Sequence, residues 1–305
     1  MSDSANIVLR FLLYVDLMLL FGIALFGLYS LKGQERISGV VLPFRSLLAG
    51  AAIVGGALSV IGMLLMVSAM SGESDLGELR PHMEMMVFEM DAGMAWMIRV
   101  TMLSVVALAM SCNTRASAPG LWLATIAGAI ALASLAWNGH GAMDEGVWHF
   151  TADILHLLAA GAWLGALVAF FWMSRNSLQS EKHIRLLARA VTRFESVGAL
   201  IVVVITVTGV VNYLYIAGPN IDAVLPGTYG VLLLIKVALF AGMLVLAALN
   251  RLHWGPLLQQ SLREGQYRVA ANTLRRSVRV ELVAGVLIVG LVAWLGTLSP
   301  QVDEL

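Results

Sequence analysis

The chain has 305 residues, of which 59% are hydrophobic and only 12% are charged, about half the share of an average soluble domain. A soluble fold could not cover so much apolar surface, and a disordered chain would need far more charge. The 19 basic and 19 acidic residues cancel, so nothing indicates a nucleic-acid partner. A single cysteine, Cys112, excludes a disulfide scaffold. The composition therefore indicates a polytopic membrane protein.

Eight stretches are long and apolar enough to cross a bilayer, whose core of about 30 Å needs about 20 residues of helix. They cover residues Ile7–Leu31, Ser46–Met70, Met90–Ser111, Gly120–Trp137, Phe150–Met173, Val197–Ala217, Tyr229–Leu249 and Leu282–Leu298. None alternates like the strands of a membrane barrel. We therefore predict an all-α, polytopic fold with eight transmembrane helices, forming a single transmembrane domain over residues 1–305.

The loops between these spans differ sharply in basic residues. Loops of one parity hold 15 Lys and Arg, whereas loops of the other parity hold only Arg80. Positive residues stay on the inner side of a membrane, so both termini are predicted to lie outside. The inner residues are Lys32, Arg36, Arg45, Arg115, Arg175, Lys182, Arg185, Arg189, Arg193, Arg251, Arg263, Arg268, Arg275, Arg276 and Arg279.

Ionisable side chains inside a span are costly, so each one raises a functional question. Asp16, Arg99, Asp153, His156 and Lys236 all fall in the outer half of the predicted bilayer. An internal ion pair between Asp16 and Arg99 would explain two of them structurally. The distribution predicts a buried site that opens to the outside.

Asp153 and His156 are spaced i, i+3 and therefore share one helix face. A carboxylate beside a histidine fixes the tautomer and raises the basicity of a metal-binding imidazole. His140, at the outer end of the fourth span, and His149, just before the fifth, would bring two more imidazoles to the same level. The alternative interpretation of His156 is an ordinary hydrogen bond between helices. The pattern makes His140, His149, Asp153 and His156 candidate metal ligands.

Methionines form a second pattern near the outer surface. Met66 and Met70 lie toward the outer end of the second span, and Met90 and Met94 lie at the outer end of the third. Thioether sulfur is a soft ligand that suits Cu(I), and imidazole suits copper and zinc. The alternative is ordinary packing against lipid or protein. The complete stripes are Met63, Met66 and Met70, then Met90, Met94 and Met97, with Met83, Met85 and Met86 in the loop between them.

Together these residues predict a site for a soft metal ion in the outer leaflet, among spans two to five. His156 is its best ligand candidate, with Asp153 orienting the ring or binding directly. Met66, Met70, Met90 and Met94 would line the approach or complete the coordination. Cu(I) is the favoured ion, and Cu(II) is the alternative.

Four local patterns resemble the copper resistance protein D (CopD) family. They are the Gly-His element in Asn138–Ala142, the Asp-x-x-His element in Asp153–Gly165, Arg193–Ser196 followed by Thr208–Gly209, and Tyr229–Lys236 followed by Asn250–Arg251. Each element is short, but their order and spacing agree over residues 138–251. His140, Asp153 and His156 are the residues that the family pattern marks.

The resemblance implies a multi-pass protein of the bacterial inner membrane that serves copper homeostasis and imports copper from the periplasm to the cytoplasm. Its partners would be copper ion and the lipid bilayer, and any soluble periplasmic copper-binding partner would be a separate protein. No Walker A motif is present, so ATP hydrolysis is not expected and the chain is not predicted to be an enzyme.

Two other functions remain open on the sequence alone. A b-type haem protein for electron transfer would need two axial ligands, either two histidines or one histidine and one methionine. A copper sensor or assembly partner would hold copper at the outer face without transporting it.

Overall fold

A computed structural model describes residues 3–39, 41–72, 75–112, 117–138, 146–177, 181–218, 227–263 and 267–298. The described residues form helices and no strand, and eight of these helices are long and apolar enough to cross a membrane. This confirms the predicted all-α class and the predicted number of spans. The eight are α1 (Asp3–Ser30), α3 (Phe44–Ser71), α5 (Asp91–Cys112), α6 (Ala118–Ala133), α7 (Val147–Ser177), α8 (Glu181–Ala217), α10 (Thr228–Leu249) and α12 (Tyr267–Leu295).

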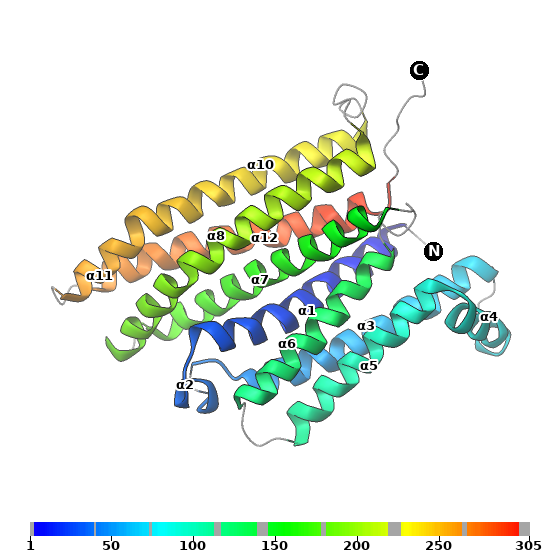
Figure 1. Cartoon of the computed structure of the whole chain (residues 1–305), viewed down its shortest axis with the longest axis horizontal. Coiled ribbons are helices and arrows are strands. Elements are labelled where there is room, and N and C mark those ends of the chain that lie inside the picture. Colours follow the sequence, from blue (N-terminus) through cyan, green and yellow to red (C-terminus); the bar gives the residue numbers. More distant parts are fainter. Residues whose placement is uncertain are drawn as a thin grey trace.

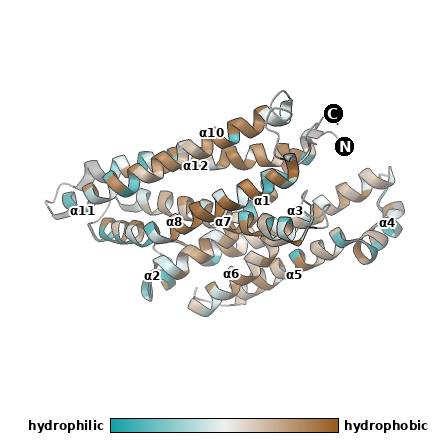
Figure 2. Ribbon diagram, turned by 45° about the horizontal axis from the view of Figure 1, so that its top comes forward, coloured by the Kyte–Doolittle hydropathy of each residue, from teal (hydrophilic) through white to brown (hydrophobic). Residues whose placement is uncertain are grey.

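Shorter elements connect the spans. They are α2 (Gln34–Ile37), α4 (Leu76–Glu89), α11 (Gly255–Arg263), the 3₁₀ turn η1 (Ser134–Asn138) and the π-helical turn η3 (Asn250–Trp254). The start of α1, the end of α12 and α4 lie at one end of the bundle, and α2 and α11 lie at the other (Figure 1). Hydrophobic residues dominate the middle of the helices, while hydrophilic residues gather toward α2, α4 and α11 (Figure 2).

Two helices begin earlier than their hydropathy predicts. α8 begins at Glu181 instead of Val197, and α12 begins at Tyr267 instead of Leu282. The extensions carry many basic residues, but they also bury apolar ones, namely Ile184, Leu187, Leu274 and Val278. The helices continue because this apolar face has packing partners beyond the predicted membrane boundary.

α1 is the central helix of the bundle. It packs against α3, α6, α7 and α12, and its residues Leu17, Leu20, Ala24 and Phe26 have no exposed surface. α1 approaches α7 most closely at glycines. A Cβ atom built on Gly165 would lie 2.3 Å from the carbonyl carbon of Gly22, so the two backbones touch where neither residue has a side chain.

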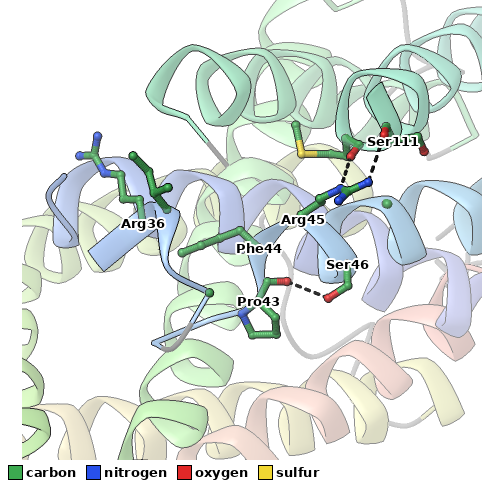
Figure 3. Close-up of a pocket in the computed structure, with 10 residues that line it drawn as sticks. Arg36, Pro43, Phe44, Arg45, Ser46 and Ser111 are labelled. Atoms are coloured by element: carbon green, nitrogen blue, oxygen red, sulfur yellow. Dashed lines mark hydrogen bonds between the residues drawn. The ribbon is translucent and has the colours of Figure 1, made fainter. Parts of the chain in front are cut away.

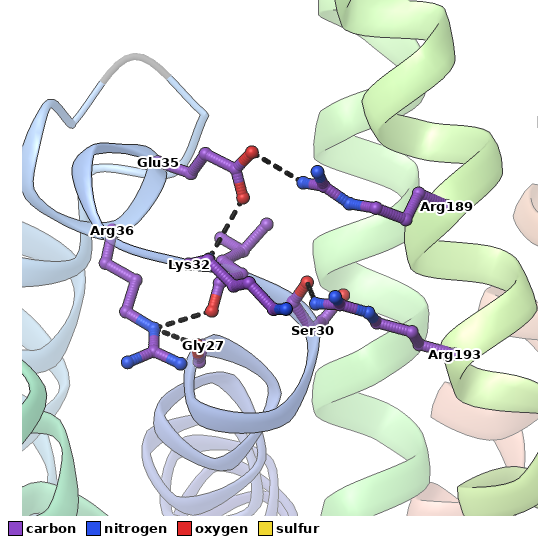
Figure 4. A network of polar contacts seen from close by, with 8 residues as sticks. Gly27, Ser30, Lys32, Glu35, Arg36, Arg189 and Arg193 are labelled. Atoms are coloured by element: carbon purple, nitrogen blue, oxygen red, sulfur yellow. Dashed lines mark hydrogen bonds and ion pairs between the residues drawn. The ribbon is translucent and has the colours of Figure 1, made fainter.

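Arginines at the basic end cap the last carbonyls of the helices, which lack partners within the helix. Arg45 donates hydrogen bonds to the carbonyl oxygens of Met110 (2.8 Å) and Ser111 (3.1 Å) at the end of α5 (Figure 3). Arg36 donates to the carbonyl oxygens of Gly27 and Leu31 near the end of α1, and Arg193 donates to that of Ser30 (Figure 4). A positive charge at a helix C-terminus also interacts favourably with the negative end of the helix dipole.

An ion pair ties the connection after α1 to α8. Arg189 Nη2 lies 2.5 Å from Glu35 Oε1, and Glu35 Oε2 accepts a hydrogen bond from the backbone N–H of Lys32 (Figure 4). Partial burial acts in the opposite direction, but these hydrogen bonds and the Arg189 charge hold the pKa of Glu35 below its usual value. A lowered carboxyl pKa stabilises the fold above the unfolded-state pKa, and this contribution is lost as the pH falls through the folded-state pKa.

The glycine contact predicts a specific weakness. Gly165→Ala should lower the free energy of unfolding by about 1–3 kcal/mol, because the new methyl group would force α1 and α7 apart. Gly242→Ala in α10 is the matched control, since a Cβ atom there would meet nothing within 4 Å. Thermal unfolding of both variants in detergent measures the difference. Equal melting temperatures would contradict the close packing of α1 on α7.

Candidate functional site

His156 lies on α7, nine residues after Val147 and therefore about 14 Å along the helix. Its Nδ1 lies 2.9 Å from Oγ1 of Thr208 on α8. The Thr208 hydroxyl donates its own proton to the carbonyl oxygen of Val204 at 2.6 Å. The Nδ1–H of His156 is therefore the donor to Thr208, and the neutral ring keeps its lone pair on Nε2. Nε2 is the atom available to a metal ion or another ligand.

Gly209 lies beside this ring. A Cβ atom at that position would lie 3.5 Å from Cε1 of His156, which is an ordinary van der Waals distance. Thr208 is therefore the residue of α8 that fixes the orientation of the imidazole.

Asp153 lies one helical turn before His156 and is bound from the same neighbouring helix. Its Oδ1 accepts a hydrogen bond of 2.9 Å from Nδ2 of Asn212. Lys236 on α10 interacts electrostatically with both Asp153 and His156. One carboxylate, one ammonium group and one imidazole therefore lie within electrostatic range of one another between α7, α8 and α10, and the negative charge of Asp153 favours the positive charge of Lys236.

A cavity of about 440 Å³ lies beside this polar group, between α7, α8, α10 and α12. His156, Thr206, Tyr213 and Lys236 contribute polar side chains to its lining. Among the described residues, the Tyr213 hydroxyl has no hydrogen-bond partner although it is buried. The remaining lining is mainly apolar, including Trp163, Leu167 and Phe240. The arrangement presents a few polar atoms to an otherwise apolar space, as small-ligand sites commonly do.

The other predicted histidines are placed differently. His149 is 1% exposed and stacks on Tyr215, with ring centroids 4.9 Å apart. His140 lies outside the described residues. Over the part of the chain that the structure describes, no group of three or more His, Cys, Asp or Glu side chains is close enough to hold one metal ion.

The predicted methionines do not join the histidine. Met66, Met70 and Met94 are 39%, 58% and 58% exposed, and Met90 is half-buried. Met66 and Met70 lie on α3, and Met90 and Met94 lie at the start of α5. These helices pack on α1, α4 and α6, whereas α7 packs mainly on α1 and α8, then on α12, and less on α6. The structure therefore separates the two halves of the predicted outer site, and His156 faces the last spans instead of spans two and three.

The predicted ion pair between Asp16 and Arg99 is wrong. The Arg99 side chain is 5% exposed and donates to the hydroxyls of Ser59 (3.2 Å) and Ser134 (3.4 Å). Asp16 lies against Gly55 of α3, and its Oδ2 makes no hydrogen bond within the described residues. The two side chains reach α3 one helical turn apart, at Gly55 and Ser59, but they have different partners.

The sequence interpretation used Thr208 only as part of the family resemblance, and it assigned no contact to Asn212 or Tyr213. A usable signal exists in their spacing. Thr208 and Asn212 are i, i+4 and share a face of α8, which matches the i, i+3 spacing of Asp153 and His156 on the antiparallel α7. Two short polar ladders on consecutive helices would have indicated that they face each other.

Comparison with known proteins gives a consistent assignment. The family "Copper resistance protein D-like, N-terminal domain" matches residues 1–150, and "Copper resistance protein D" matches residues 188–295. The chain is 50% identical to "Copper resistance protein D" of Pseudomonas syringae pv. tomato, over 99% of each chain. It is 28% identical to "Inner membrane protein YebZ" of Escherichia coli (strain K12), over 96% of this chain and 98% of that protein.

A third relative is "Copper transport protein CutJ" of Bacillus subtilis (strain 168), which is 28% identical over 79% of this chain and 45% of its own length. No solved structure matches the chain.

The charge compensation at the site predicts a coupled effect on stability. Asp153→Asn should destabilise the fold by about 3 kcal/mol, because the Lys236 ammonium group would lose its compensating charge in a low-dielectric environment. The double variant Asp153→Asn/Lys236→Met should recover most of the loss. Unfolding in detergent measures the cycle, with Glu84→Gln as the control because the Arg80–Glu84 pair is exposed and such pairs contribute little. Strictly additive effects would show that the two charges are independent.

Proposed function

This chain belongs to the copper resistance protein D family, and we propose that it carries copper across the bacterial inner membrane from the periplasm to the cytoplasm. The observation that supports this proposal is the polar group of Asp153, His156 and Lys236 beside a cavity between four membrane-spanning helices. The names of the Pseudomonas and Bacillus relatives point to copper resistance and copper transport. In this proposal copper is the cargo.

His156 Nε2 is the first ligand that we propose for the ion. Imidazole binds copper in both oxidation states, and Cu(I) accepts the low coordination numbers that such a site offers. His140 would supply a second imidazole from the outer connection before α7. Asp153 balances the charge of Lys236, so the arriving cation does not meet an uncompensated positive charge.

The route inward from His156 follows two cavities that share a wall. A second cavity, of about 570 Å³, lies nearer the basic end, and Trp163 and Leu167 line both. Its polar lining includes Asn250 and Glu281, and the Asn250 amide donates a hydrogen bond to the Glu281 carboxylate. A carboxylate inside a membrane-spanning helix commonly marks an ion or proton pathway. We therefore place the route between α7, α8, α10 and α12, with Trp163 and Leu167 as the apolar barrier.

The proposed direction requires the basic end of the bundle to face the cytoplasm. Cys112 tests this orientation, because it is the only cysteine in the chain and is exposed at the end of α5. A membrane-impermeant maleimide should leave Cys112 unmodified in spheroplasts and should modify it after the inner membrane is permeabilised. Labelling of intact spheroplasts would reverse the orientation and would place His156 on the cytoplasmic side.

Uptake of copper into proteoliposomes tests the function itself. His156→Ala should reduce the initial rate of Cu(I) uptake at least tenfold, since it removes the Nε2 ligand. His253→Ala is the matched control, because that histidine is exposed on η3 and lies outside both cavities. Equal uptake by the parent protein and the His156 variant would contradict the proposed ligand.

Two further results would redirect the assignment. Stoichiometric copper binding without uptake would favour the sensor or assembly role. A Soret band in the optical spectrum of the purified protein would favour the haem-protein alternative, because copper does not give one.

A further inference from the structure

A second group of soft ligands lies at the outer end of the bundle, far from His156 in the fold. Four buried residues of α3 and α4 form a small cluster of their own, namely Met63, Val67, Leu79 and Met86. Met83 and Met90 pack against this cluster, together with Val87 and Trp96. Four methionine side chains therefore belong to one apolar cluster where α3, α4 and the start of α5 come together.

This group overlaps only partly with the methionines that the sequence predicts as ligands. Of the four candidate ligands Met66, Met70, Met90 and Met94, only Met90 belongs to it, and the other three are exposed. The other members are Met63 of the first stripe, and Met83 and Met86 of the connection that follows it. The difference arises from α4, which was predicted as a loop. As a helix, α4 (Leu76–Glu89) turns Met83 and Met86 toward α3 and α5, and its neighbour Met85 remains 45% exposed.

The backbone at Gly93 fixes the position of Met86. A Cβ atom on Gly93 would lie 2.1 Å from the carbonyl oxygen of Met86 and 2.6 Å from the Cα of Val87. The end of α4 can rest on the start of α5 only because residue 93 has no side chain. The buried position of Met86, which is 2% exposed, therefore depends on a close approach of two backbones.

The composition of this cluster differs from that of the main core. The main core is built mostly of Leu, Ala, Ile, Val and Phe, whereas methionine supplies two of the four buried members here and two of their packing partners. Thioethers suit Cu(I) and related soft cations. They also carry no titratable proton, so they do not lose their ligand atom in mild acid. Exposed acidic residues stand nearby, at Glu84, Glu89 and Asp91, and would raise the local concentration of cations.

We propose that Met63, Met83, Met86 and Met90 form a thioether site for a soft monovalent cation, which captures Cu(I) at the outer end of the bundle. The identity of the cation rests on the proposed copper function, but the ligand set does not. The site is separate from His156, because α3 and α5 lie on the far side of α1 and α6 from α8 and α10.

Leucine substitution tests the site, because Leu keeps the volume and hydrophobicity of Met while removing the sulfur. The variant Met63→Leu/Met83→Leu/Met86→Leu/Met90→Leu should lose one equivalent of bound Cu(I), or bind it at least tenfold more weakly, in a titration against a chromogenic Cu(I) chelator. The matched control is Met66→Leu/Met70→Leu/Met94→Leu, which alters exposed methionines on α3 and α5 and should bind as the parent does. Copper X-ray absorption should show sulfur neighbours in the parent and lose them in the cluster variant only.

Gly93→Ala provides an independent test that changes no sulfur atom. Gly93→Ala should weaken Cu(I) binding to the cluster, because the new methyl group would push Met86 away from α5. His156→Ala is the control, and it should leave the sulfur neighbours of copper unchanged. Parental affinity and unchanged sulfur scattering in the cluster variant would overturn the site, as would loss of binding in the exposed-methionine control alone. If copper uptake is absent but this sulfur signal remains cluster-dependent, the transport proposal fails and the thioether site stands.

Discussion

The main constraint on this structure is that the hydrocarbon core of a membrane offers no water to a polar atom, so each one needs a partner inside the protein. Helices pair the backbone N–H and C=O groups with each other. Hydroxyl side chains donate to backbone carbonyl oxygens, as Ser59 does to Gly55 and Thr208 does to Val204. The same constraint places Arg99 between two serine hydroxyls. The same constraint determines which ring nitrogen of His156 carries the proton. Because the Thr208 hydroxyl donates to the carbonyl oxygen of Val204, Nδ1 of His156 must be the donor to Thr208. The site therefore has a defined free lone pair before any ligand arrives.

Sequence patterns predicted the features that depend on one helix alone. Hydropathy located all eight spans because a bilayer imposes the same length on each, and the i, i+3 spacing placed Asp153 beside His156. Patterns were less informative where a helix continues outside the membrane, since the packing of Ile184 and Leu274 is not visible in a hydropathy average. The helix α4 was missed for a related reason, because its apolar residues are too few and too interrupted by charge to resemble a span.

Features that join two helices could not be obtained in the same way. Depth along a helix follows from counting residues, but the direction of a side chain depends on how the helix is rotated against its neighbours. Asp16 and Arg99 have matching depths and still point to different partners. Met66 and Met90 were grouped by depth, yet only Met90 faces the cluster under α4. Conversely, Lys236 approaches Asp153 from a helix about 80 residues later in the sequence.

The two proposed copper sites differ in the oxidation state that they would select. Imidazole nitrogen binds copper in both oxidation states, whereas thioether sulfur is a soft ligand that suits Cu(I). A cluster of Met63, Met83, Met86 and Met90 would therefore hold the reduced ion, while His156 would accept either form. Under both proposals, the outer thioether site would select Cu(I) before the ion reaches the imidazole. Copper capture at the cluster would then depend on a reductant more strongly than copper binding at His156 does, because only the thioether site discriminates between the two oxidation states.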